Sequence, residues 1–377
     1  MQLKRCYLFF QLQCFLKTCE ILLFILISDM TKQRITIMLC AVLFCAALGV
    51  YAPLKSSVLE TERRLASAFP ELPHGISSGK IKKFCAGIDR FYADHFPLRS
   101  TILSAASVIF AYTGNHYDTS RCYQGKSNWL FLGNDYSKCV DKLTGKESLN
   151  ENQIERMAAK YSRLQRLVDS GASQFLILIG PNKSTIYGEH LPGFIFPSRV
   201  RYISPLVAKL RAMNIDVYDP TERLMSFKSN RLLYYRTDTH WNLLGAYVAF
   251  EGLREYAKWP PLFPATFKNV PSKHGDLVNI GGYTSFHIID DDTFSLNDFH
   301  IQSSPSQDDT ITTVQASSDK AVWVFGDSFT EALKPFIQAQ FRTVRYFKHD
   351  DFKKVMKSDA PRPDIVLWVV VERNFAE

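Results

Sequence analysis

Short apolar runs alternate with longer amphipathic stretches in the C-terminal part of the chain. The helical pattern is clearest over residues 151–169, whose apolar positions recur on one face at Ile154, Met157, Tyr161, Leu164 and Val168. Asn150 and Gln153 can cap the start of this helix reciprocally. The apolar runs have the length of buried strands and lie at residues 174–179, 215–218, 321–325, 343–347 and 365–371. Apolar strands separated by helices predict an α/β fold, with helices on both faces of a parallel sheet.

Two segments depart from this alternation. Between residues 260 and 319, clusters of Gly, Asp and Ser predict an insertion of loops and short strands. Residues 53–75 mix Pro, Ser and charges and are interpreted as a stalk. A helical region then runs to Tyr112, with a break at Phe96–Arg99. We therefore predict one α/β domain over residues 76–377.

Residues 35–52 form an uncharged apolar stretch that follows Lys32 and Arg34. Its length is close to that of a membrane-spanning helix, and its positive flank lies on the amino side. We predict a signal anchor, with the remainder of the chain exported. A cleaved signal peptide is the alternative, because small residues lie at Ala46 and Ala47. We favour the anchor because the apolar stretch continues past these alanines.

The first 34 residues are predicted to be a cytoplasmic segment. Residues 7–28 are rich in Leu, Phe and Ile, but Lys17 and Glu20 interrupt them, and a charge inside a membrane is costly. A second spanning helix is therefore not expected. Because basic residues follow Met30 as in a natural signal sequence, we interpret residues 1–29 as the product of an upstream start-site assignment.

The composition is that of a folded protein with a modest positive charge. The 377 residues are 46% hydrophobic and 22% charged, and the formal net charge is +8. The basic residues are dispersed, without an arginine-rich helix or zinc-finger spacing, which argues against a nucleic-acid partner. A mildly basic surface would suit an acidic polysaccharide or an anionic membrane surface.

Three of the eight cysteines lie outside the N-terminal region, at Cys85, Cys122 and Cys139. Cys122 and Cys139 bracket a predicted hairpin around Trp129–Asn134, and they are either disulfide-bonded or two buried free thiols. The chain has no CxxC motif or Cys/His cluster, so we expect neither a metal nor a cofactor.

Two short motifs, far apart in the sequence, supply a nucleophile, a base and a carboxylate. They are Thr237-Asp238-Thr239-His240-Trp241-Asn242 and Val324-Phe325-Gly326-Asp327-Ser328-Phe329. A serine hydroxyl becomes a good nucleophile when an imidazole takes its proton and a carboxylate orients that imidazole. Each motif alone is a weak signal, since Gly-Asp-Ser is typical of turns. Together, at the ends of segments in an alternating chain, they indicate a site at the carboxyl edge of the sheet.

Ser328 follows an apolar run and precedes a helical stretch, which predicts an exposed position at a strand-to-helix turn. We predict that His240 is the base, Asp238 its orienting acid and Ser328 the nucleophile. Asp327 is a rival acid. We prefer Asp238 because it is two residues from His240, so both side chains can lie on one side of an extended loop. The only oxyanion donor that the sequence nominates is the backbone N–H of Ser328.

Four further residues are candidates for substrate binding: Lys183, Tyr187, Trp241 and Arg373. Lys183 and Arg373 either hold the carboxylate of an acidic sugar or are solvated surface charges. For the nearby Arg236 we favour the surface interpretation. Trp241 is either a platform for a sugar ring or part of the packing under the histidine loop, and packing is the preferred interpretation.

With these motifs the chain resembles the alginate O-acetyltransferase family, whose catalytic domain is SGNH hydrolase-like and flavodoxin-like. The similarity rests on Phe96–Arg99, Trp129–Gly133, Pro181–Lys183, Leu191–Pro192, Thr237–Trp241, Gly326–Phe329 and Glu372–Arg373. The family's triad carries over to Asp238, His240 and Ser328. The Asp-x-His pair precedes the serine here, whereas ordinary SGNH esterases have the serine first. The resemblance also implies a single-domain, membrane-anchored member without a C-terminal carbohydrate-binding module.

What the resemblance implies is a single-pass protein of the bacterial inner membrane with a periplasmic catalytic domain. It would acetylate polysaccharide hydroxyls with acetyl groups supplied by a membrane-bound O-acyltransferase partner. The polymer stays open between alginate, cellulose and another exopolysaccharide. Two other functions are kept as alternatives: an acetyl esterase that uses the same triad, and a non-catalytic scaffold for polysaccharide export.

Overall fold

The computed structural model describes residues 58–59, 64–65, 67–71, 78–95, 120–169, 173–262, 264–270, 275–281, 293–297, 303–305 and 310–377. The chain divides into two compact units, residues 1–106 and 107–377, which are described separately. The predicted cytoplasmic segment and the predicted anchor, together residues 1–52, lie outside the described residues. None of the helices within the described ranges combines the length and the apolar character needed to cross a membrane.

The described part of the first unit consists of a short hairpin and one helix. Strands β1 (Val58–Leu59) and β2 (Arg64–Leu65) pair in antiparallel fashion. Helix α3 (Ser78–His95) carries a carboxylate, that of Asp94, which accepts hydrogen bonds from the backbone N and the hydroxyl of Ser67. The predicted helical region is therefore present to residue 95. Its expected break and its continuation to Tyr112 lie outside the described residues.

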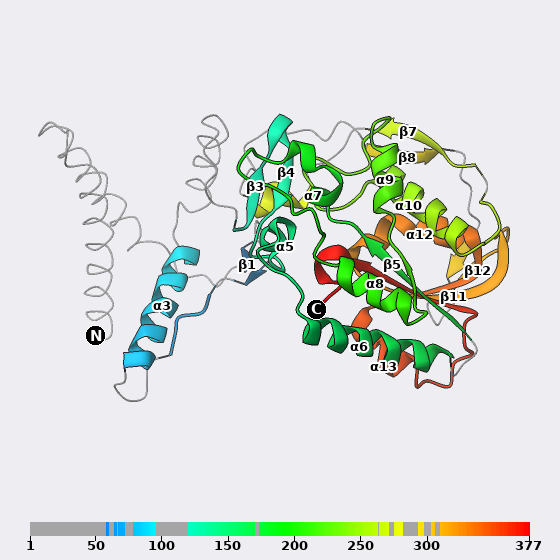
Figure 1. Cartoon of the computed structure of the whole chain (residues 1–377), viewed down its shortest axis with the longest axis horizontal. Helices are drawn as coiled ribbons and strands as arrows, with labels where there is room; N and C mark the ends of the chain where they lie inside the picture. The colour runs from blue at the N-terminus through cyan, green and yellow to red at the C-terminus, as the bar shows by residue number, and fades with distance from the viewer. Residues whose placement is uncertain are drawn as a thin grey trace, which may run out of the picture. The chain divides into compact units, whose positions relative to one another are not determined.

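The second unit is built around a seven-stranded sheet with the strand order β6-β5-β13-β11-β12-β10-β9 (Figure 1). Five of its strands are the predicted apolar runs: β5 (Gln174–Gly180), β6 (Asp216–Tyr218), β11 (Ser318–Gly326), β12 (Phe341–Phe347) and β13 (Ile365–Val371). These five are parallel to one another. All residues of the central strand β13 are buried, as expected for a strand that is covered on both faces.

The prediction of a wholly parallel sheet is wrong at one edge. Strand β10 (Ile311–Thr313) pairs antiparallel to β12, and β9 (Ser303–Pro305) pairs antiparallel to β10. Both strands come from the predicted insertion. They are short and polar, so no apolar run marks them in the sequence, and a hairpin added to an edge is antiparallel because it needs no crossover helix.

Helices cover both faces of the sheet, as predicted (Figure 1). One face packs against α6 (Glu151–Asp169), α8 (Ser204–Ala212) and α13 (Phe352–Val355). The other packs against α9 (Thr221–Phe227), α10 (Leu243–Tyr256) and α12 (Lys334–Gln340). Successive strand residues alternate between the two cores, so that Ile177 joins the first and Leu178 the second.

Local signals at helix ends explain where two helices begin. Asn150 N donates to Gln153 Oε1 and Gln153 N donates to Asn150 Oδ1, both at 2.9 Å, which confirms the predicted reciprocal cap of α6. The helix predicted over residues 330–339 is instead a 3-10 helix, η3 (Ser328–Leu333), followed by α12. Pro335 stands in the first turn of α12, where its missing N–H is tolerated.

The second unit also contains two hairpins and three short helices. They are the hairpin β3 (Cys122–Gln124) and β4 (Leu130–Leu132), the short helices α5 (Cys139–Thr144), α7 (Lys183–Ile186) and α11 (Asp276–Ile280), and the hairpin β7 (Thr266–Val270) and β8 (Thr293–Asn297). The predicted hairpin around Trp129 is thus present. Its two flanking cysteines are buried free thiols rather than a disulfide. Burial raises the pKa of Cys122 to about 12, so this thiol is neutral at physiological pH.

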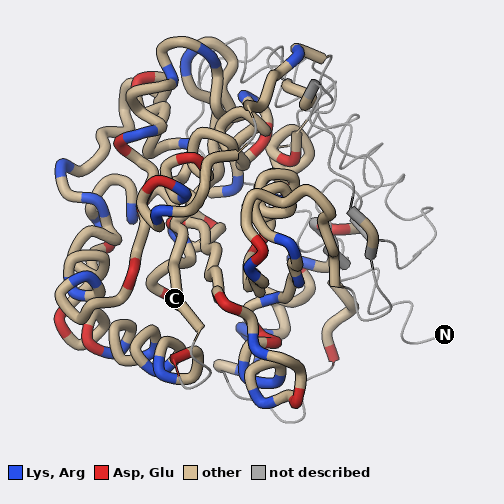
Figure 2. The backbone as a smooth tube through the Cα atoms, turned by 90° about the vertical axis from the view of Figure 1, so that its right-hand side faces the viewer, with Lys and Arg blue, Asp and Glu red and all other residues tan. Residues whose placement is uncertain are grey.

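Charges are interspersed over the described backbone. In the view of Figure 2, Lys and Arg positions lie among Asp and Glu positions rather than in one basic stripe. This agrees with the dispersed basic residues of the sequence.

Candidate active site

Ser328 lies at the carboxyl edge of the sheet, where β11 ends and η3 begins, and its side chain is exposed. The turn is tight, because a Cβ at Gly326 would collide with the Thr330 hydroxyl. Both oxygens of Asp327 serve this turn: Oδ1 accepts from Phe329 N at 3.0 Å and Oδ2 accepts from Val371 N at 2.7 Å. Asp327 therefore fixes the turn that carries the serine, and its carboxylate oxygens bind backbone N–H groups, whereas His240 binds Asp238.

His240 sits on a loop that is closed on itself just before α10. Tyr234 and Trp241 form an antiparallel bridge, and Asn242 N donates to Leu233 O at 2.9 Å. The side chain of Asn242 then caps α10 by accepting from Gly245 N at 2.9 Å. These contacts fix the position of the loop that carries His240 relative to α10.

Ser328, His240 and Asp238 form a continuous hydrogen-bonded chain. The distance from His240 Nε2 to Ser328 Oγ is 2.8 Å, and that from His240 Nδ1 to Asp238 Oδ1 is 2.6 Å. Asp238 Oδ1 also accepts from the backbone N of His240 at 3.0 Å. The structure thus brings the three predicted residues together in the order that a nucleophile, a base and an orienting acid require.

The carboxyl of Asp238 stays ionised at neutral pH. Burial acts to raise its pKa, but the hydrogen bond and the charge of His240 outweigh burial and lower the pKa to about 2. An ionised carboxylate can only accept hydrogen bonds, so the proton of the imidazole is held on Nδ1. Nε2 is then free to accept the proton of Ser328.

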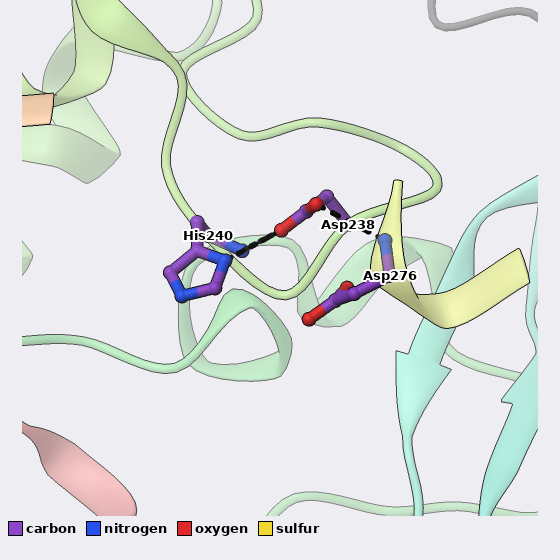
Figure 3. Close-up of side chains that lie close together, drawn as sticks. All are labelled: Asp238, His240 and Asp276. Atoms are coloured by element: carbon purple, nitrogen blue, oxygen red, sulfur yellow. Dashed lines mark hydrogen bonds and ion pairs between the residues drawn. The ribbon is translucent and has the colours of Figure 1, made fainter. Parts of the chain in front are cut away.

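Asp276 is part of this cluster, although the sequence did not nominate it (Figure 3). Its backbone N donates to Asp238 Oδ2 at 3.1 Å. Its side chain accepts from Thr239 twice, from the backbone N at 2.9 Å and from the hydroxyl at 2.8 Å. Gly275 allows this approach, because a Cβ there would collide with Asp238 and with the carbonyl of Thr237. In the sequence, a Gly-Asp pair before the apolar Leu277 is the one signal that could have marked this helix start.

Asp238, His240 and Asp276 offer ligand atoms that lie within 4.8 Å of one another. Carboxylate and imidazole are common metal ligands. However, Nδ1 and Oδ1 are 2.6 Å apart, the distance of a charge-assisted hydrogen bond, and Asp238 Oδ2 accepts a backbone N–H. The donor atoms are already used within the cluster, so the arrangement fits a proton relay better than a metal site.

Lys183 is neither a solvated charge nor placed to hold a sugar. It is 4% exposed, and its ammonium donates to the carbonyls of Tyr235, Arg236 and Asp238 at 3.0, 3.0 and 2.7 Å. The lysine therefore stabilises the loop that carries His240 by binding three of its backbone carbonyls. Arg236, expected on the surface, is half-buried.

Tyr187 and Trp241 are also inside the fold. Tyr187 is 2% exposed, and its hydroxyl accepts from Leu233 N at 2.9 Å. Trp241 is 1% exposed, and its Nε1 donates to Phe329 O at 3.1 Å. The burial of Trp241 agrees with the packing interpretation. Its indole also links the motif that contains His240 to the motif that contains Ser328. Burial leaves neither side chain open to a sugar ring.

Arg373 is the one member of the four that borders open space. Its guanidinium lies 5.8 Å from the centre of the Phe329 ring, and Nη1 is 3.5 Å from Asn182 Oδ1. The side chain also lines a cavity of about 420 Å³, which the three triad residues themselves do not line. The charged residues around this cavity are Lys142, Arg199, Arg201, Lys228, Arg373, Glu189 and Glu372, so basic side chains outnumber acidic ones.

Comparison with known proteins places this geometry in context. A family model described as the SGNH hydrolase-like domain of the acetyltransferase AlgX matches residues 122–353. The chain is 26% identical over 200 residues to a probable alginate O-acetylase AlgJ of Pseudomonas aeruginosa, covering 52% of this chain and 47% of that protein. It is 26% identical over 164 residues to the Pseudomonas putida protein of the same name, covering 41% and 40%. The matched region thus spans less than half the length of these relatives.

Two solved structures match part of the chain. PatB1 of Bacillus cereus with a sulfonyl adduct is 15% identical with a TM-score of 0.50, and the match covers 70% of this chain and 98% of PatB1. The O-acetyltransferase domain of Pseudomonas putida AlgJ is 20% identical with a TM-score of 0.49, and the match covers 68% of this chain and 92% of that domain. The likeness to PatB1 concerns the fold alone.

Proposed function

Because the chain belongs to the SGNH hydrolase-like domain family of the acetyltransferase AlgX, we propose that it transfers acetyl groups to the hydroxyls of a polysaccharide. The observation that carries this proposal is the unbroken hydrogen-bonded chain from Ser328 through His240 to Asp238. The curated relatives, which are named probable alginate O-acetylases, support the same reaction class and a polysaccharide acceptor.

The reaction has two steps: Ser328 first receives the acetyl group from the donor and then passes it to the acceptor. In the first, His240 Nε2 takes the proton of Ser328 as Oγ attacks the carbonyl of an acetyl ester. The alcohol of the donor leaves with that proton, and acetyl-Ser328 remains. In the second step, His240 takes the proton of a polysaccharide hydroxyl, which attacks the acetyl group, and Ser328 leaves with the proton. Asp238 stays ionised and stabilises the imidazolium in both steps.

The acceptor in this proposal is an anionic exopolysaccharide such as alginate. Arg373 supports this choice, because its guanidinium lies 5.8 Å from the centre of the ring of Phe329, the residue that follows Ser328. Arg199 lines the same cavity as Arg373. Lys142 and Lys228 of this cavity already pair with Glu377 and Glu189, so in this proposal Arg373 and Arg199 are the cations that meet the charge of the polymer.

The setting of the enzyme is part of the same proposal. Residues 35–52 anchor the chain in the bacterial inner membrane, and the catalytic domain lies in the periplasm. There it receives acetyl groups through a membrane-bound O-acyltransferase partner. The apolar stretch and its basic flank are the features of the chain that support this location.

An acetyl esterase is the second candidate. Ser328 is exposed, so water can compete with a sugar hydroxyl for the acetyl-enzyme. Product analysis separates the two: acetylated oligosaccharide supports transfer, whereas acetate alone supports hydrolysis.

The decisive experiment combines an acetyl ester donor, an alginate oligosaccharide and the Ser328→Ala variant. We expect the variant to lose at least about 10³-fold in kcat, and mass spectrometry to find an acetyl group on Ser328 in the wild type only. Ser226→Ala is the matched control, because Ser226 is an exposed serine on α9. Polymer acetylation that survives Ser328→Ala in cells would refute the catalytic role and favour a scaffold.

A further inference from the structure

We propose that Asp276 and Thr239 form a second arm of the triad, which fixes the proton of His240 on Nδ1. In this arm an ionised Asp276 accepts the hydrogen of the Thr239 hydroxyl, so that the hydroxyl oxygen presents a lone pair to Nδ1–H. Both residues are positioning residues that act through His240. The inference rests on the proposed function, because it assigns a role to side chains around the proposed base.

The distances define the direction of this arm. Thr239 Oγ1 lies 2.8 Å from Asp276 Oδ2 and 3.2 Å from His240 Nδ1. A hydroxyl has one hydrogen, and an ionised carboxylate accepts only, so the hydrogen points to Asp276. Nδ1–H is then shared between Asp238 Oδ1 and the Thr239 oxygen. This sharing favours the tautomer in which Nε2 can accept the proton of Ser328.

A neutral group in place of the Asp276 carboxylate would reverse the arm. Asp276 Oδ1 accepts from Thr239 N at 2.9 Å, so an asparagine would keep its oxygen there and direct its NH₂ group to the Thr239 hydroxyl. The hydroxyl hydrogen would then be free to turn toward Nδ1. That orientation favours a proton on Nε2, and such an imidazole cannot accept the proton of Ser328.

The docking of α11 explains why Asp276 is available for this role. Thr237 O accepts from Leu277 N at 3.1 Å, and Thr237 Oγ1 accepts from Gly275 N at 3.1 Å. Together with the bond from Asp276 N to Asp238 Oδ2, these contacts hold α11 against Thr237 and Asp238, at the start of the Asp-x-His motif. These backbone contacts dock α11 without the Asp276 carboxylate, which is therefore available to bind Thr239.

The charged and titratable groups around Asp276 come from three neighbouring elements. Asp238 and His240 lie on the histidine loop, the neutral thiol of Cys122 on β3, and the Lys183 ammonium, which binds Asp238 O, on α7. Burial and the charge of Asp238 raise the pKa of Asp276, while Thr239 and His240 act in the opposite direction. The negative charge of Asp276 in turn stabilises the positive imidazolium that forms as His240 takes the proton of Ser328.

The test measures kcat, KM and the pH profile with p-nitrophenyl acetate on the full chain. We expect Asp276→Asn and Thr239→Val each to lower kcat about tenfold with KM unchanged. Thr239→Ser, which keeps the hydroxyl, recovers most of the rate lost in Thr239→Val. In Asp276→Asn the acid limb of kcat/KM moves to lower pH, whereas in Thr239→Val it stays in place. Asp359→Asn, an exposed carboxylate before β13, is the matched control.

Two further readouts separate this arm from a merely structural role. The double variant Asp276→Asn/Thr239→Val should be no slower than Thr239→Val alone, because both residues act through one contact. In ¹⁵N-histidine-labelled protein, the Nδ1–H signal of His240 should weaken in Asp276→Asn. If Asp276→Asn fails to fold, the pair Thr239→Val and Thr239→Ser decides by the rate and the Nδ1–H signal.

Wild-type kcat in Asp276→Asn, or multiplicative losses in the double variant, would overturn the inference. An active Ser328→Ala variant would instead overturn the proposed function. An inert Ser328→Ala together with a fully active Thr239→Val would leave the triad in place and remove only the second arm.

Discussion

At the scale of single residues, burial decides which charged groups near the triad can meet a substrate. Lys183 is used up by three backbone carbonyls, whereas Arg373 keeps its guanidinium beside the cavity. From the sequence the two were equivalent, because each is a cation in a loop after a strand. The difference comes from the histidine loop, whose carbonyls converge on Lys183 from more than fifty residues away, and no local pattern predicts such a contact.

Arg373→Ala should therefore weaken acceptor binding more than chemistry. We expect KM for an alginate oligosaccharide to rise roughly tenfold, as for the loss of one charge-assisted contact, while KM for the acetyl donor stays the same. The comparison is made by initial-rate kinetics, with the exposed Arg166→Ala on α6 as control. An unchanged acceptor KM, or an equal effect on a neutral oligosaccharide, would contradict the binding role.

Asp238 makes stability depend on acid pH. Its pKa is about 2 in the folded chain and 3.8 ordinarily, so its contribution is complete above about pH 4 and is lost as the pH falls toward about 2. The shift corresponds to about 2 kcal/mol. We expect the urea-unfolding free energy of the wild type to fall more steeply across this range than that of Asp238→Asn.

The raised pKa of Asp276 works against this trend, because its protonation in acid favours the folded state. The proteins with Asp238 and with Asp238→Asn are therefore also compared when both carry Asp276→Asn. In that background we expect the difference between their slopes of unfolding free energy against pH to be larger. Parallel slopes in both backgrounds would show that Asp238 is not held ionised by the fold.

At the scale of elements, the predictable part of the fold is the part with a strong hydrophobic pattern. The five apolar runs became the five parallel strands, and the two motifs were correctly placed at strand and helix ends. The insertion was predicted as loops and short strands, and short strands are present there, but their positions and partners were not predicted. Its strand β10 completes the sheet edge and its helix α11 reaches the histidine loop, but both are short, and their partners are set by tertiary contacts.

Gly275→Ala tests whether α11 positions the triad. The added Cβ would collide with Asp238 and with Thr237 O, so the loop and the helix must separate. A displacement of this kind in an active site costs about 10²-fold in rate, which we expect in kcat with little change in the melting temperature of the unit. Gly193→Ala is the control, because no atom lies within 4 Å of its added Cβ. Equal activity in both variants would show that this contact is dispensable.

At the scale of the whole molecule, the site belongs to the second unit, and the proposed membrane setting depends on residues 35–52. With an uncleaved anchor, we expect the protein to remain in the membrane pellet after alkaline carbonate extraction. N-terminal sequencing of the same material should begin at Met30. A soluble protein that begins after Ala47 would indicate a cleaved signal peptide, and an intact Met1 would refute the start-site interpretation.

The indole of Trp241 ties the carbonyl of Phe329 to the histidine loop, and the Phe329 ring lies 5.0 Å from the His240 ring. The turn that carries Ser328 and the loop that carries His240 are therefore held together by direct contacts, although 88 positions separate the two residues along the chain. On heating, we therefore expect enzymatic activity and folded structure to be lost in the same transition, without a folded but inactive intermediate.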